Sequence, residues 1–465
     1  MKHTYNYLGT LLLFIGLISC ELTDIDEIQP KFQISTELVF SDSESAEQAL
    51  VGVYNLTLLN YGAWLWNATD HGQMGIELVS PFGDSPFSTN LLNSEIATLN
   101  HYSDPFQAIN AINYIIAGVP TIDNDLFEGN RKAEILGEAH LLRAFSYFNL
   151  LRSYGQFWDK NSSYGMVIHT NPNAAIVAKP RSTVQETYDL ILSDLDFAIE
   201  NAPTFNTAVY ASKEAAKAIK ARVLSYYGGN DAYVEAAALC KEVINSGYFS
   251  WEASYEDIFK NTFNSNEAIL VNHWDGTENS NGNVKPLLLP FLVKASPIYM
   301  DLMPLNDPRR EIIMTSQGTI TKYASLNDPD APSGHSGTFY MRLAEVYLIQ
   351  AECLVRSGAP LSEAQLALDV VRARVGLPGT AASDANQLLA DIRTEKLLDL
   401  AFEDAQPWFD MVRYHVLGDI DISTIKPTID VATNGVSQFI LPIPPKSLKL
   451  SKGLVVQNPG YPVEN

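Results

Sequence analysis

The sequence predicts a mainly α-helical protein, built from antiparallel helix hairpins and interrupted by irregular insertions. Apolar residues recur at spacings of three and four along several segments, which is the period of an amphipathic helix. Turns of about five or six residues follow these segments, which makes antiparallel packing of neighbouring helices the economical arrangement. Two long stretches, residues 61–105 and 260–335, are instead rich in Gly, Asn, Asp, Ser and Pro and have little sustained period.

The N-terminus has the pattern of a lipoprotein signal peptide. Lys2 and His3 precede an apolar stretch, residues 8–18, which is followed by Ser19 and Cys20. About a dozen apolar residues are too few to cross a bilayer, which takes roughly 20. We therefore expect residues 1–19 to be removed and the thiol of Cys20 to carry lipid, so that the membrane contact is through a lipid anchor only. An ordinary secretory signal with an incidental cysteine is the alternative.

Composition favours an exported, folded binding protein. The chain has 465 residues, 46% of them hydrophobic, which is enough for a substantial core, and its formal net charge is −23. Such a charge repels phosphate backbones, so we expect no nucleic acid partner, and it disfavours polyanionic glycans. The polar segment of residues 20–35 is expected to be a tether between the anchor and the folded domain.

Three apolar stripes mark the expected helices. Their members are Tyr188, Leu192, Leu195 and Ile199; Ala216, Ile219, Val223 and Tyr226; and Met341, Ala344, Leu348, Ala351 and Val355. Pro203 ends the first helix, while Gly228 ends the second and Gly358 the third. Cys240 and Cys353 each lie within an apolar helical pattern, so we expect buried free thiols, with a disulfide between them as the alternative. No clustered spacing of His, Cys or carboxylates suggests a metal, and no cofactor is expected.

Two of the hairpins repeat one pattern of small residues. Ala221, Gly228 and Ala237 have counterparts, displaced by 130 positions, at Ala351, Gly358 and Ala367. Small residues at fixed places let paired helices approach closely, as in tetratricopeptide units. Two unrelated alanine-rich hairpins are the alternative. We expect hairpin units near 105–155, 183–250 and 338–415, with loop-rich insertions near 61–105 and 260–335.

Six segments carry recognisable motifs. They are Phe40 to Asn55, Glu138 to Gly155, Asp307 to Arg310, Tyr340 to Leu348, Glu395 to Arg413, and the pair Leu441 to Pro444 with Gln457 to Tyr461. The last pair resembles the "PIP…QNPGY" signature of SusD/RagB family outer-membrane nutrient-binding lipoproteins. The segment from Glu138 is similar to the "EAxxLRAxxYFxLxxxYG" signature of the same family, and the others resemble its remaining motifs.

The resemblance implies a SusD-like domain over residues 36–465, with a tetratricopeptide-like helix-hairpin scaffold and a loop-rich ligand-binding subdomain. It also implies a position at the cell outer membrane, facing the cell exterior. The implied partner is a SusC-like TonB-dependent barrel transporter. The implied role is non-catalytic capture of an oligosaccharide, and RagB-like capture of a peptide is the alternative.

Aromatic residues within the two insertions are the candidates for ligand binding. Sugars present apolar faces that stack on aromatic rings, and hydroxyl rims that need planar polar partners. The candidate residues are Trp64, Trp66, Asn67, Asp70, Phe82 and Asp84 in the first insertion, and Asn272, Trp274 and Asp275 in the second. An ordinary packed turn or a half-buried strand is the structural alternative. We expect Trp158 and Trp408 to pack in the scaffold, and Arg143 and Arg152 to be paired within it.

Two other functional classes compete with this interpretation. Glu403, Asp404 and Asp410 lie close together beside Trp408, which suggests a glycoside hydrolase with an acid/base pair. A chain with 54 acidic residues is nearly certain to have such a group somewhere, and no GxSxG, HExxH or phosphate-binding loop is present. A tetratricopeptide scaffold that binds a protein segment would explain the helices but not the aromatic insertions.

Overall fold

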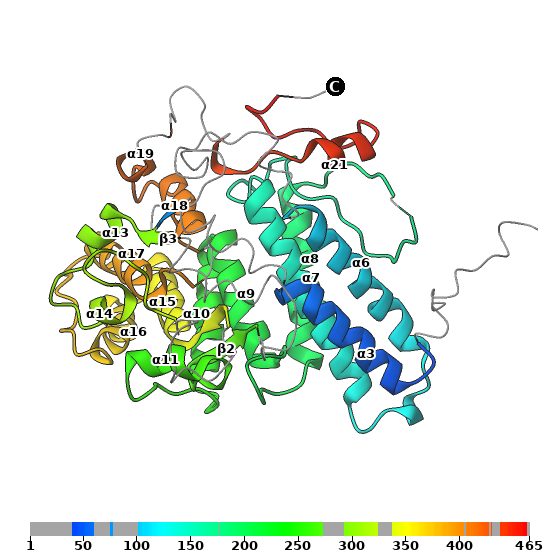
Figure 1. The fold of residues 1–465 in the computed structure, drawn as a ribbon, viewed down its shortest axis with the longest axis horizontal. Helices are drawn as coiled ribbons and strands as arrows, with labels where there is room; N and C mark the ends of the chain where they lie inside the picture. The colour runs from blue at the N-terminus through cyan, green and yellow to red at the C-terminus, as the bar shows by residue number, and fades with distance from the viewer. Residues whose placement is uncertain are drawn as a thin grey trace, which may run out of the picture.

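The computed structural model describes residues 40–59, 75–77, 101–175, 177–272, 293–323, 337–403, 406–426, 429 and 438–462. Helices dominate these residues, as predicted (Figure 1). The longer helices are α3 (Ser43–Tyr54), α6 (Ser103–Gly118), α7 (Arg131–Tyr154), α8 (Val184–Asn201), α9 (Lys213–Tyr227), α10 (Asn230–Ile244), α15 (Leu343–Arg356), α16 (Leu361–Ala373), α17 (Ala385–Leu400) and α18 (Gln406–Val416). The short ones are α11 (Tyr255–Asn261), α13 (Pro297–Leu302), α14 (Arg310–Ile313), α19 (Ile422–Ile425) and α21 (Pro445–Leu450).

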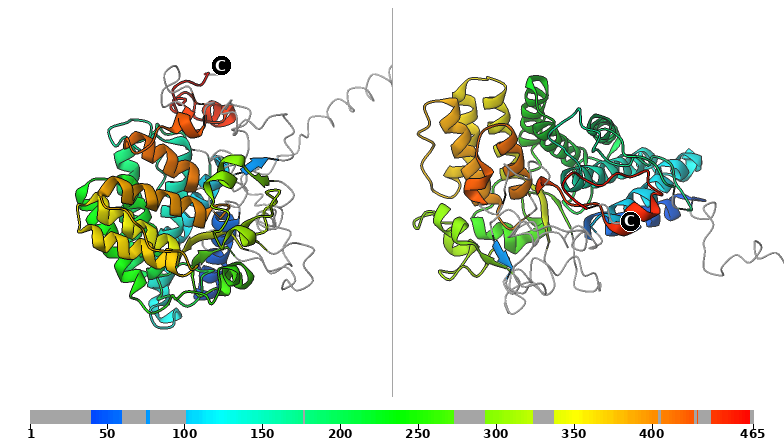
Figure 2. Two further views of the ribbon diagram at one scale, coloured as in Figure 1. Left: turned by 90° about the vertical axis from the view of Figure 1, so that its left-hand side faces the viewer. Right: turned by 90° about the horizontal axis from the view of Figure 1, so that it is seen from above.

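The helices form one continuous array. Consecutive helices from α6 to α10 pack against one another in order, and α15 packs against both α16 and α17. Helix α10 packs directly on α15, although residues 245–342 separate them in the sequence. Figures 1 and 2 show the array running from α3 and α6 at one end of the molecule to α16 and α17 at the other.

The repeated pattern of small residues coincides with two helix hairpins of the same design. Ala221 on α9 and Ala351 on α15 are fully buried at the helix contacts. Gly228 and Gly358 follow these helices with φ values of +71° and +75°, a left-handed conformation that glycine adopts without strain. The predicted free thiols are also confirmed, because Cys240 and Cys353 are unbridged and buried.

Two short antiparallel sheets interrupt the array. Strand β1 (Gly75–Glu77) pairs with β3 (Val293–Ala295), and β2 (Ala268–Val271) pairs with β4 (Phe339–Arg342). The prediction that Met341 begins the third helical stripe is therefore wrong. Met341 lies in β4 and pairs with Leu270, and the helix begins at Leu343. Pairing with a strand that is distant in the sequence satisfies the backbone here, and it overrides the local helical period.

The second insertion has a core of its own. Side chains from α11, β2, α13, the segment of residues 313–323 and the end of α17 form a hydrophobic cluster distinct from that of the helical array. Its buried aromatic rings are those of Tyr255, Phe259, Tyr299, Tyr323, Phe339 and Phe402. The described part of residues 260–335 is therefore a packed subdomain attached to the array. No described helix has both the length and the apolar character needed to cross a bilayer.

Replacing Ala351 by leucine should destabilise the hairpin of α15 and α16. Ala351 is fully buried in the cluster that joins α15, α16 and α17, so extra methylene groups there should cost about 1–3 kcal/mol of unfolding free energy. Thermal unfolding followed by circular dichroism measures the effect. Ala373→Leu, at an exposed position of α16, is the matched control and should unfold like the wild type. Equal unfolding temperatures for the two variants would contradict the proposed packing.

Candidate functional site

Most of the predicted ligand-binding residues lie outside the described residues. These are Trp64, Trp66, Asn67, Asp70, Phe82, Asp84, Trp274 and Asp275, and the predicted lipidation site Cys20 lies outside them as well. Their roles stay predictions. Asn272 is described, and the structure also describes the chain segments from which both insertions emerge.

The β1–β3 pairing joins the two insertions. Gly75 pairs with Ala295, Ile76 with Lys294, and Glu77 with Val293. Strand β1 lies in the first insertion, between Asp70 and Phe82 in the sequence, and β3 lies at the end of the segment that follows Asp275. In Figure 2 the short blue arrow of β1 lies beside the lime-green segment that contains β3. Two segments about 220 positions apart, each within an insertion that contains candidate tryptophans, are thereby paired.

Strand β4 and the residues before it contact Leu58, just before the first insertion, and Asn272, within the second. The hydroxyl of Tyr340 donates a hydrogen bond to the carbonyl of Leu58, next to the point where the first insertion leaves the helices. The side-chain oxygen of Asn272 accepts the backbone N–H of Thr338 at 2.5 Å. A Cβ at Gly337 would lie 2.7 Å from the carbonyl oxygen of Asn272, so glycine is needed for this close approach.

Asn272 is only 1% exposed, and its described contact is with the backbone. Asn272 therefore links the second insertion to the backbone just before β4. A ligand contact from Asn272 itself stays a prediction.

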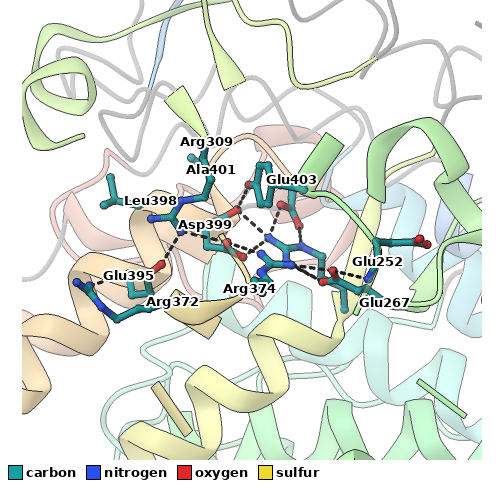
Figure 3. Close-up of polar contacts among 12 residues, drawn as sticks. Glu252, Glu267, Arg309, Arg372, Arg374, Glu395, Leu398, Asp399, Ala401 and Glu403 are labelled. Atoms are coloured by element: carbon teal, nitrogen blue, oxygen red, sulfur yellow. Dashed lines mark hydrogen bonds and ion pairs between the residues drawn. The ribbon is translucent and has the colours of Figure 1, made fainter. Parts of the chain in front are cut away.

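A buried network of ion pairs lies beneath the subdomain (Figure 3). Its members are five cations, Arg309, Lys322, Arg342, Arg372 and Arg374, and five anions, Glu267, Asp307, Glu395, Asp399 and Glu403. The positive and negative charges are equal in number, so they can neutralise one another within the network. The network joins the subdomain to β4 and to the ends of α16 and α17.

Asp399 is the centre of this network. Its carboxylate contacts Arg309 at 3.1 Å, Arg342 at 2.5 Å and Arg374 at 2.5 Å, and all four side chains are largely buried. Burial alone would raise the pKa of Asp399, but the surrounding cations outweigh burial and hold the pKa well below its usual range. Asp399 is therefore ionised at neutral pH, and its charge offsets three guanidinium groups.

Lys322 supports a strained turn at the end of α17. Phe402 has φ of +67° while buried, a conformation that side chains other than glycine rarely adopt. Lys322 donates to the carbonyl of Ala401 at 2.7 Å, and Tyr323 donates to that of Phe402 at 2.9 Å. Burial lowers the pKa of Lys322 to about 8, although Glu403 lies 2.6 Å from its Nζ. The subdomain thus holds this turn in place.

The carboxylates that suggested a hydrolase are engaged in separate buried networks. Glu403 is paired with Arg342 and Lys322, while Asp410 is paired with Lys396 at 2.6 Å and with Arg413 at 3.0 Å. Asp404 lies outside the described residues. Because Glu403 and Asp410 are each paired with buried cations, they have structural roles and do not form the acid/base pair of a glycoside hydrolase. In the described part of the chain, no group of three or more His, Cys, Asp or Glu side chains could hold a metal ion.

The predicted packing residues are in the scaffold. Trp408 is buried on α18, and Trp158 packs edge-on against Phe157. Arg143 pairs with Asp194 at 2.7 Å. Arg152 is fully buried and lies 4.2 Å from the centre of the Phe148 ring. These contacts join the residues to the helical scaffold.

Replacing Asp399 by asparagine should strongly destabilise the protein. The change leaves buried guanidinium groups without a counter-charge, which typically costs about 3–5 kcal/mol of unfolding free energy. Denaturant unfolding at pH 7 measures the loss, and Asp301→Asn, at an exposed position of α13, is the control.

The difference between wild type and Asp399→Asn should also depend on pH. Because the folded-state pKa of Asp399 is depressed, its stabilisation is present above the unfolded-state pKa, about 3.9, and is lost as the pH falls further towards the folded-state value. A difference that stays constant down to pH 2 would show that the charge of Asp399 is not what stabilises the network.

Comparisons with known proteins agree with one another. A family model described as SusD family matches residues 310–461, and a second, described as starch-binding associating with outer membrane, matches residues 74–224. SusD-like protein P38 of Formosa agariphila is 27% identical over 273 residues, a match that covers 56% of this chain and 50% of that protein. A SusD-like protein of Bacteroides ovatus is 22% identical over 431 residues, covering 81% of this chain and 76% of that protein.

Solved structures share the fold. A laminarin binding SusD-like protein superposes with a TM-score of 0.74 at 23% identity, covering 91% of this chain and 100% of that chain. A SusD superfamily protein from Parabacteroides distasonis superposes with a TM-score of 0.75 at 19% identity, covering 92% of this chain and 100% of that chain. Together the two family models span most of the described residues, including most of the helical array, β4 and Asp399. The chain therefore belongs to the SusD/RagB family, whose members are non-catalytic binding proteins.

Proposed function

We propose that this chain captures a neutral glycan at the cell surface and delivers it to a SusC-like TonB-dependent barrel transporter in the outer membrane. The observation that carries the proposal is the β1–β3 pairing, which joins the two insertions in which Trp64, Trp66 and Trp274 lie. Aromatic rings drawn from two segments can contact one sugar chain from more than one side. The buried Asp399 network ties the described part of the second insertion to the helical array.

Charge and the nature of the relatives support a neutral ligand. The formal net charge of −23 repels polyanionic glycans. One matching family model is named for starch binding, and one similar structure is a laminarin binding protein. Starch and laminarin are both uncharged glucans. A neutral glucan is therefore the first ligand to test, and a peptide is the alternative, as for RagB-like proteins.

The membrane position is proposed from the N-terminal sequence and the family. Lipid on Cys20 would anchor the folded domain, and residues 20–35 would give it reach. The family model for residues 74–224 carries the description of association with the outer membrane. A binding protein anchored there is suited to act as a hinged lid over a transporter.

Replacing the insertion tryptophans should weaken glycan binding without unfolding the protein. Trp64→Ala, Trp66→Ala or Trp274→Ala should each be tested, and at least one should lose about 1–3 kcal/mol of binding free energy, the scale of a truncated aromatic contact. Calorimetry of the full chain in mild detergent, with laminarin, soluble starch and a peptide mixture as ligands, measures the change. Trp158→Ala is the control, since it should lower the melting temperature and leave the affinity of the folded protein unchanged. Binding of peptides but of no glycan would contradict the proposed ligand.

The transporter partner should be recoverable from membranes. Affinity purification of the tagged wild type in mild detergent should yield a TonB-dependent receptor in near-equal amount. The Cys20→Ala variant should be lost from the membrane fraction. Its purification should yield little of the receptor, because the lipid anchor is what concentrates the two proteins on one surface. Recovery of the wild type alone at low salt would contradict the partnership.

A further inference from the structure

A cavity of about 320 Å³ opens between α3, α7 and the segment of residues 203–211. This cavity, the α3–α7 cavity, is lined by Glu47 and Tyr54 on α3, Arg131 and Glu138 on α7, and Thr207 and Tyr210 on the segment. Its volume is at the lower end of the range for small-molecule sites. None of these residues is among the predicted ligand contacts.

The charged groups of the α3–α7 cavity are fixed by one another. Arg131 spans the two carboxylates, with Nη2 at 2.8 Å from Glu47 and Nη1 at 2.6 Å from Glu138. The hydroxyl of Tyr54 donates to Glu138. Glu47 keeps 39% of its side chain exposed and Arg131 keeps 28%, whereas Glu138 is buried. The cavity therefore offers a preorganised pair of planar polar groups at its surface.

Tyr210 supplies an exposed aromatic wall. Its side chain is 48% exposed, and its ring meets that of Tyr54 edge-on with centroids 5.2 Å apart. The backbone is held next to it, because the N–H of Ala211 donates to the Tyr54 hydroxyl at 2.8 Å. An exposed ring on a fixed backbone loses little freedom when a ligand stacks on it.

The same segment is bonded to the base of the second insertion. The carbonyl of Ala208 accepts the N–H of Val271 at 2.8 Å. Val271 is the last residue of β2 and precedes Asn272, the first of the predicted ligand-binding residues in the second insertion. The wall of the α3–α7 cavity is thus connected by one hydrogen bond to the strand that immediately precedes Asn272, Trp274 and Asp275.

We propose that the α3–α7 cavity is an additional saccharide subsite, which takes one ring of a neutral glycan that the insertions hold. Tyr210 stacks on the apolar face of the ring, while Glu47 and Arg131 form hydrogen bonds with its hydroxyl groups. Thr207 provides a further hydroxyl at the wall. Stacking beside a carboxylate and a guanidinium is the combination that a polyhydroxylated ring requires.

This subsite rests on the proposed function for its class of ligand. A lysine or arginine side chain of a peptide is the competing occupant, because two carboxylates line the cavity. One negative charge is left over when Arg131 is set against both, but each of the four carboxylate oxygens already accepts a hydrogen bond from Arg131 or Tyr54, which leaves an ammonium group few open acceptors. A neutral ring is therefore the better match.

A length series of oligosaccharides tests the subsite. Laminari-oligosaccharides from the disaccharide upward, or the series of whichever glucan binds the wild type, are titrated into the full chain in mild detergent. Tyr210→Ala should weaken binding of the long oligosaccharides roughly tenfold and leave the short ones unchanged, since the subsite adds a contact only for a ring beyond those that the insertions hold. Tyr210→Phe keeps the ring and should restore the affinity.

Tyr248→Ala is the matched control, because Tyr248 is a tyrosine of similar exposure, 45%, that does not line the cavity. Hydrogen exchange of residues 203–211 should slow with long oligosaccharides only. Wild-type affinity in Tyr210→Ala at every length would overturn the subsite while leaving the proposed function intact. Equal loss in Tyr248→Ala, or binding of a lysine-rich peptide that Tyr210→Ala abolishes, would overturn it too. Failure of every glucan to bind the wild type would instead overturn the proposed function and the subsite with it.

Discussion

The pairing of buried charges around Asp399 is the constraint on which the arrangement of this protein depends. Arg309 comes from the turn before α14, Arg342 from β4 and Arg374 from the end of α16, and all three meet one carboxylate. A buried ion pair is weak evidence of net stability, since desolvation offsets much of the attraction. A packing of these segments that separated the charges, however, would leave a buried charge without a partner. We interpret the network as a device that fixes how the subdomain sits on the helices.

The helical array could be predicted from the sequence because its determinants are local. The stripe of Tyr188 and Leu195 and the glycines at 228 and 358 mark helices and turns within a few residues of themselves. Strand β4 could not be predicted in this way. The apolar period that includes Met341 fits a helix, and the partner strand that decides otherwise lies about 70 positions earlier. The resemblance to a known family identified the protein's class where periodicity could not.

The candidate site was predictable only in part. Tryptophans in aperiodic, polar segments can be recognised in the sequence. The pairing of those segments depends on three residue pairs between β1 and β3, which no sequence pattern predicts. The ion pairs of Arg309 were also hidden, because it and Asp399 are 90 positions apart. Tyr210 lies in no motif. The available signal was an aromatic residue within a short segment rich in Thr, Asn and Pro between two helices.

The direct contact between α10 and α15 has a consequence for how such a protein can diversify. Residues 245–342 leave the array after α10 and return to it at α15, which packs directly on α10. They therefore form a long loop-like insertion whose two ends lie at neighbouring helices. The entropy lost in closing a loop grows only with the logarithm of its length, so lengthening this insertion reduces the free energy of folding only slightly. Ligand preference can therefore change by insertion, deletion and substitution within these residues, provided that the charges which dock them on Asp399 are kept.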